Sequence, residues 1–89
     1  MIKIIKAVAA TDARIKLVFS DDSFGELDLQ PLIDRNTVLT AALADPAFRA
    51  RCYLELGALC WPNGLELSAA SIHQQLSADG RLQSAAKAA

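Results

Sequence analysis

The sequence holds few of the residues on which catalytic and metal sites usually depend. Its 89 residues include one histidine, two cysteines and four glycines. A structural zinc ion takes four ligands, and His73, Cys52 and Cys60 together fall short of that number. The glycines are too scattered for a phosphate-binding loop, and no serine stands in a Gly-x-Ser-x-Gly elbow. We therefore expect no catalytic residues, no metal and no cofactor, and the chain is not predicted to be an enzyme.

The two cysteines are also too few for a disulfide framework. The first six residues carry two lysines where the apolar segment of a secretion signal would run. We therefore predict a cytoplasmic protein with two free thiols. Cys52 falls in phase with Leu54 and Leu56 on the core face of an expected strand, where thiols are inert. His73 is expected on the solvent side of its helix, so no nucleophile and base pair with a cysteine is predicted.

Neither sign of charge dominates the chain. Nine Lys and Arg residues stand against ten Asp and Glu residues, for a net charge of −1 without any basic run. Phosphate binding needs clustered cations, so this composition argues against a general nucleic-acid or membrane binder. The hydrophobic fraction of 53% and the mean hydropathy of +0.25 are, by contrast, high for so short a chain. A homodimer face is the ordinary destination for such apolar surface.

The residue pattern predicts one small α+β domain over residues 1–78. The N-terminal third alternates apolar and polar residues as half-buried strands do, most clearly over residues 14–20, although Val18 blurs the polar face. We expect turns at residues 11–13 and 21–23, because Asp and Ser side chains bond the local backbone there. These turns would join three strands into an antiparallel meander.

Three aspartates lie near these turns. Asp21 and Asp22, with Asp12 nearby, could supply oxygen ligands for a divalent cation. Adjacent aspartates at a hairpin tip point apart, however, and commonly serve as solvated turn formers. The turn interpretation is favoured.

The middle of the chain is expected to be helical. Pro31 can open a short turn, and Asn36 or Thr37 can cap a following helix that has Val38 on its apolar side. Asp45–Pro46 ends that helix and starts another turn, because Asp caps helices and Pro suits the first helical position.

The C-terminal half is predicted to return to strands before a last helix. Residues 51–56 alternate as a strand, Gly57 with Ala58 turns the chain, and residues 59–61 form the partner strand, giving a second short β-hairpin. Ser68 is a good N-cap for a C-terminal helix that ends at Asp79–Gly80. We predict that the tail, residues 79–89, is helical and lies at an oligomer interface.

The second hairpin carries the residues that we consider for an interaction surface. Arg49 and Arg51 lie two apart, on the outer face if residues 51–56 form a strand, and with Arg35 they could make a small basic patch for the acidic surface of a partner. A solvated strand face is favoured, because exposed charges need no purpose. Trp61 is either a recognition platform or a core residue that buries about 150–250 Å²; the core is favoured, with the indole edge at the surface or at a dimer seam. The candidate interaction surface comprises residues on and beside this hairpin: Arg49, Arg51, Tyr53, Trp61, Pro62 and Asn63.

Four segments together resemble a known bacterial family. Residues 14–23, RIKLVFSDDS, are similar to an L-x-V-x-F-x-D-G opening, and residues 25–29 look like a strand ending in x-D-L. Residues 43–48 are similar to an L-x-D-x-x-x-F helix end, and residues 61–67, WPNGLEL, to a W-P-N-G-x-D-L signature. This order resembles the family catalogued as domain of unknown function 2442, over about residues 1–76. The chain departs from the family pattern in having Ser for the turn Gly, and Glu for Asp in the signature.

The resemblance implies a compact α+β domain, similar to the N-terminal module of some bacterial regulators in which a helix-turn-helix follows. It implies no catalytic residues, since none is established for stand-alone members. It also suggests membership of a two-gene, toxin–antitoxin-like pair.

Three classes of function are consistent with these observations. The preferred hypothesis is a non-enzymatic protein-interaction module, either homodimeric or paired with another small protein. The alternative is an accessory transcriptional regulator that contacts DNA phosphates through the available cations, namely Arg14, Lys16, Arg49 and Arg51. A third hypothesis is a small-molecule sensor with a pocket near Trp61. No membrane association is expected.

Overall fold

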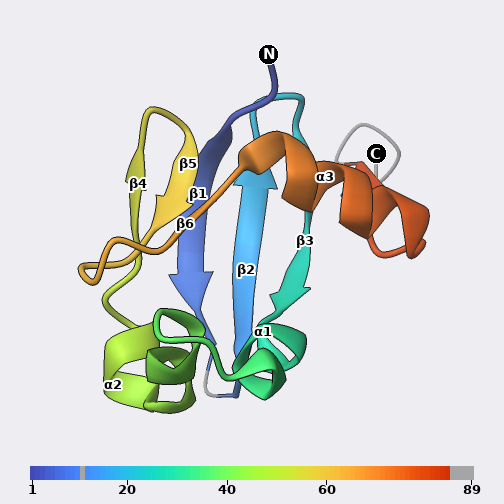
Figure 1. Ribbon diagram of the computed structural model, residues 1–89. Coiled ribbons are helices and arrows are strands. Elements are labelled where there is room, and N and C mark those ends of the chain that lie inside the picture. The colour runs from blue at the N-terminus through green and yellow to red at the C-terminus, as the bar shows by residue number, and fades with distance from the viewer. Residues whose placement is uncertain (11, 85–89) are drawn as a thin grey trace.

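The computed structural model describes residues 1–10 and 12–84 and confirms the α+β class (Figure 1). Its larger sheet has four antiparallel strands in the order β1-β2-β3-β7. These strands are β1 (Ile4–Ala9), β2 (Arg14–Phe19), β3 (Ser23–Asp28) and β7 (Gln83–Ser84). The first three form the predicted meander.

Alternation along β2 sets the two faces of this sheet. Ile15, Leu17 and Phe19 are at most 1% exposed and face the core, so the residues between them face outward. In β1 the register shifts between Ile4 and Lys6, which leaves Ile5 as an extra residue. Lys6 and Val8 consequently pair with outward residues of β2.

The predicted turn at residues 21–23 is confirmed. Asp21 accepts hydrogen bonds from the backbone N–H and the hydroxyl of Ser23, and Asp22 has a left-handed φ of 68°. Asp21 thus has the turn-forming role that short polar side chains commonly take.

A second, three-stranded sheet has the order β4-β5-β6 and comprises β4 (Tyr53–Glu55), β5 (Ala58–Cys60) and β6 (Glu66–Leu67). Its hairpin turns at Leu56–Gly57, one residue before the predicted position, because Glu55 pairs with Ala58. Both turn residues are left-handed, with φ of 51° and 82°, as a tight two-residue hairpin requires. Leu56, predicted to face the core, is therefore 94% exposed.

The helical middle is shorter than predicted. It consists of α1 (Gln30–Arg35), the 3₁₀ turn η1 (Thr40–Ala44) and α2 (Pro46–Arg49). Asn36 ends α1 in a left-handed conformation instead of capping the next helix. The Thr37 and Thr40 hydroxyls each accept a hydrogen bond from the other residue's backbone N–H, and residues 37–39 form a turn that precedes η1. Val38, predicted to be on an apolar helix side, is consequently 95% exposed.

Helix α3 (Ala69–Ala78) covers the inner face of the larger sheet (Figure 1). The Ser68 hydroxyl caps it by accepting from the Ser71 N–H, as predicted, and Ile72 and Leu76 are buried. The second sheet lies beside β1, and α1 and α2 lie at one end of the larger sheet (Figure 1). The core between these elements contains buried apolar residues from all of the layers: Ile4, Ile15, Leu17, Phe19, Leu27, Leu29, Leu43, Leu59, Trp61, Leu65, Ala69, Ile72 and Leu76. No helix of the described residues is both long enough and apolar enough to span a bilayer.

The segment after α3 differs from the predicted helical tail. Gly80 is left-handed, with φ of 68°, and ends the helix as expected. The chain then turns back, and residues 83–84 pair with Ser23 and Phe24 of β3. The prediction of a helix is therefore wrong for residues 79–84, and residues 85–89 lie outside the described part of the chain.

Candidate interaction surface

Two residues of the predicted surface are buried instead. Arg49 belongs to helix α2 and not to a strand, and it is 9% exposed. Its guanidinium Nη1 donates to the carbonyl oxygens of Leu43 at 3.0 Å and Ala44 at 3.3 Å. Trp61 is 0% exposed, and its indole Nε1 donates to the carbonyl oxygen of Arg49 at 3.2 Å. The core interpretation of Trp61 is confirmed, but the predicted indole edge at the surface or at a dimer seam is wrong, because the side chain is wholly buried. Neither residue offers its side chain to a partner.

The other predicted surface residues stay near the outside but have different roles. Arg51 and Pro62 are exposed, and Tyr53 is 46% exposed on the outer strand of the second sheet. Asn63 is half-buried: its Oδ1 accepts from the Leu65 N–H, and its Nδ2 donates to the carbonyl oxygen of Leu39 at 3.0 Å. Asn63 therefore holds the turn after Trp61 against the middle of the chain.

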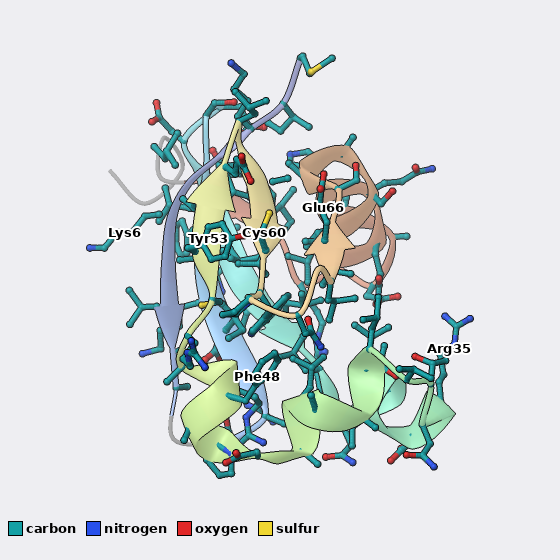
Figure 2. The ribbon with its side chains drawn as sticks, turned by 60° about the vertical axis from the view of Figure 1, so that its left-hand side comes forward. Lys6, Arg35, Phe48, Tyr53, Cys60 and Glu66 are labelled. Atoms are coloured by element: carbon teal, nitrogen blue, oxygen red, sulfur yellow. The ribbon has the colours of Figure 1, made fainter. Side chains whose placement is uncertain are left out.

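Both thiols are free. Cys60 is 4% exposed and lies in register between Tyr53 and Glu66 (Figure 2). Burial, and then the carboxylates of Glu66 and Glu55, raise the pKa of the Cys60 thiol. Burial likewise raises the pKa of Cys52. A raised pKa leaves little thiolate, the reactive form.

His73 makes a long-range contact that the sequence did not indicate. Its Nε2 lies 2.9 Å from Oδ2 of Asp21, which is 52 residues away, and its ring meets Phe19 edge-on at 5.0 Å between centroids. The His73 side chain is 26% exposed, so the predicted solvent-facing position is only partly correct. Hydrogen bonds from the hydroxyl and N–H of Ser23, and then from His73, lower the pKa of Asp21 to about 2.

A further candidate surface is the outer face of the larger sheet, opposite α3. It forms a shallow, open hollow of about 640 Å³. The outward-facing side chains that line it come from all four strands and the segment before β7: Lys6, Val8, Arg14, Lys16, Val18, Phe24, Glu26, Asp28, Arg81 and Gln83. We call this set the outer face. Figure 2 shows Lys6 projecting away from the body of the domain on this side.

Strand register sorts the outer face into rows. In the first row Lys6 pairs with Val18, Val18 with Phe24, and Phe24 with Gln83. In the next, Lys16 stands between Val8 and Glu26, and in the last Arg14 pairs with Asp28. The cations of the strands thus belong to β1 and β2, the carboxylates belong to β3, and the apolar pair Val18–Phe24 adjoins them.

The segment that carries Arg81 packs closely against a glycine in β3. A Cβ at Gly25 would come within 2.9 Å of the carbonyl oxygen of Arg81, so a larger residue would push the chain away. The Arg81 N–H also bonds to the carbonyl oxygen of Leu76 at 2.8 Å. These contacts fix the segment that leads into β7 and place a fourth cation at the edge of the hollow.

The opposite charges that face each other across β2 and β3 are not joined. Among the residues that the structure describes, the ion pairs are Arg14–Asp12 at 3.7 Å and His73–Asp21 at 2.9 Å. Lys16 and Glu26 are therefore close in register without forming a pair with each other. The sequence identified Arg14 and Lys16 as available cations. The apolar Val18 at an outward position of the same strand was the sign that this face also has an apolar part.

Comparisons with protein-family models, with curated proteins and with solved structures give no match for this chain. The family resemblance therefore stays a prediction, and the geometry of the outer face is the observation that bears on function.

Proposed function

We propose that this protein is a non-enzymatic interaction module that binds another protein chain across the outer face. The observation that carries the proposal is the composition of that face: cations on β1 and β2, carboxylates on β3, and the half-buried Val18 and Phe24 in the row beside the charged pairs. Protein interfaces characteristically combine apolar contacts with polar and charged ones. The partner would be a second copy of the chain or another small protein.

The same face argues for a protein in preference to a nucleic acid. Lys6, Arg14, Lys16 and Arg81 all line the hollow, which is the observation in favour of a DNA-binding regulator. Glu26 and Asp28 line it as well and would repel phosphates. Arg49, one of the cations expected to contact DNA, is occupied by backbone carbonyls in the interior.

The sensor hypothesis receives less support than either of these. It relied on a pocket near Trp61, and the Trp61 side chain is 0% exposed. A ligand could reach the indole only by opening the core.

Affinity capture from the cells of origin tests the proposal with two matched variants. Val18→Glu places a carboxylate in the apolar pair of the outer face, and Tyr53→Glu places one on the second sheet at a residue that is 46% exposed. We expect wild type and Tyr53→Glu to retain a bound protein chain and Val18→Glu to lose it, with circular dichroism showing that both variants fold. Equal retention by Val18→Glu, or loss only in Tyr53→Glu, would contradict the proposal. Captured nucleic acid that salt releases would favour the regulator instead.

A further inference from the structure

We infer that the outer face binds a second copy of this chain, face to face, about a two-fold axis that runs parallel to the strands between β2 and β3. The inference rests on the proposed function and names its partner. Its basis is the way in which register arranges the charges.

The symmetry of such a dimer decides which residues meet. A two-fold axis that lies in the interface and runs parallel to the strands places each row of one copy opposite the same row of the other. It also places β2 of one copy opposite β3 of the other. Each outward residue of β2 or β3 therefore faces, in the second copy, the type of residue that is already its neighbour across these two strands. Aligned sheets pack in this way about 10 Å apart, at a crossing angle near −30° that results from their twist.

All of the paired rows are complementary under this operation. Lys16 meets Glu26 of the second copy, and the symmetric contact repeats it. Arg14 likewise meets Asp28, and Val18 meets Phe24. At the outer edges of the face, Lys6 meets Gln83 of the second copy, which is polar and carries no positive charge.

Other placements of the axis bring like charges together. An axis along β2 sets Lys16 against Lys16 of the second copy, and an axis along β3 sets Glu26 against Glu26. An axis across the strands through the Lys16–Glu26 row makes both of these contacts at once. Like charges directly opposite each other are destabilising, so the position between β2 and β3 is favoured.

The second copy also accounts for side chains that the monomer leaves unpaired. Lys16 and Glu26 are exposed and form no ion pair with any residue in the described ranges 1–10 and 12–84. Val8, on the same face, is 48% exposed. Packing Val18 and Phe24 against the second copy would remove water from the adjacent charges and strengthen their attraction.

The size of the face sets the expected strength of the dimer. Four strands of up to six residues cover roughly 300–400 Å² in projection, given the strand spacing and the rise per residue. Stable interfaces bury about 800 Å² per partner, so this one belongs among the weak ones. We expect a dissociation constant of about 10–100 μM, sensitive to salt.

Charge reversal at one pair tests the inference by sedimentation velocity, from about 5 to 500 μM so that the expected constant is bracketed. Lys16→Glu alone and Glu26→Lys alone should each weaken the dimer at least about tenfold, since each sets like charges against one another. An equimolar mixture of the two variants should recover a dimer, because position 16 of one then faces the opposite charge at position 26 of the other. Glu66→Lys, which makes the same charge change on the second sheet, should behave as wild type.

The mixture separates contacts between copies from contacts within one copy. Each variant places like charges across β2 and β3 in its own chain, and mixing cannot relieve that repulsion. Recovery in the mixture therefore supports the interface, provided that circular dichroism shows each variant to be folded. A wild type that stays monomeric at every concentration, or a dimer that both reversals leave intact, would overturn the inference. If Val18→Glu still abolished capture of a different protein, the proposed function would stand without it.

Discussion

Trp61 donates a hydrogen bond from its indole Nε1 to the main-chain carbonyl oxygen of Arg49, at 3.2 Å. The guanidinium of Arg49 in turn donates to the carbonyl oxygens of Leu43 and Ala44. The hydrogen bonds of Arg49 and Trp61 thus join η1, α2 and the segment after β5. This connection fixes the helical end of the domain to the second sheet.

Replacing Trp61 with Phe should destabilise the domain by about 2–3 kcal/mol. The change removes buried ring volume and leaves the Arg49 carbonyl without its donor. Urea unfolding measures the loss, and Tyr53→Phe, at a half-exposed residue, is the control that should have almost no effect. A loss below about 0.5 kcal/mol would show that this hydrogen bond and this packing contribute little.

Arg49→Met should cost about 1–3 kcal/mol, because it keeps the apolar stem and deprives buried carbonyls of a donor. Arg51→Met removes the same charge from an exposed position, so its stability should remain within about 0.5 kcal/mol of wild type. Chemical denaturation of the two variants side by side distinguishes a capping role from a general effect of charge. Equal stabilities would contradict the role that we assign to Arg49.

Substitutions at the two neighbouring residues of the hairpin turn, Leu56 and Gly57, should change the stability of the domain in opposite directions. Leu56 has φ of 51°, which non-glycine residues other than Asn and Asp adopt at a cost, so Leu56→Asn should stabilise by about 0.5–1 kcal/mol. Gly57→Ala should destabilise, because φ is +82° and the new Cβ would lie 2.6 Å from Cβ of Lys3. Thermal unfolding should place the two variants on either side of wild type. A stabilising Gly57→Ala would refute this turn geometry.

Asp21 should titrate with a pKa of about 2, well below the ordinary value of 3.8, mainly because of Ser23. Since folding lowers this pKa, the contribution of Asp21 to stability is present above pH 3.8 and is lost as the pH falls toward 2. Carboxyl NMR titration should show that Ser23→Ala raises the midpoint more than His73→Gln does. The Ser23→Ala variant should also lose less stability across that pH interval. A wild-type midpoint near 3.8 would contradict the assignment.

The meander was predictable because its signals are local. Apolar and polar residues alternate over β2 with the period of a strand, and the aspartates after Phe19 form a turn within three residues. The cap at Ser68 and the stop at Gly80 are local in the same sense.

The errors came from contacts that local patterns do not contain. Extending the alternation of residues 51–56 backward places Arg49 on a strand, but the Asp45 cap and Pro46 start a helix that carries Arg49 to carbonyls five and six residues earlier. The turn at Leu56–Gly57 requires a leucine in a left-handed conformation, which propensity disfavours.

The sequence indicated only part of the candidate surface, because the rest depends on which strands pair and in which register. Arg14 and Lys16 stand out on one strand, but register is needed to bring Glu26 and Asp28 beside them. Strand β7 has only two residues, and its pairing with β3 places Gln83 beside Phe24. The contact between Asp21 and His73 spans 52 residues and left no pattern in the sequence.

Amide chemical shifts recorded over a dilution series test most directly whether the outer face is the interaction surface. We expect concentration-dependent shifts to concentrate on β2 and β3, around Lys16, Val18 and Glu26, and to disappear in Val18→Glu. Shifts that cluster instead around Tyr53 and Leu56, or around Val38, would place the interface elsewhere and contradict the account.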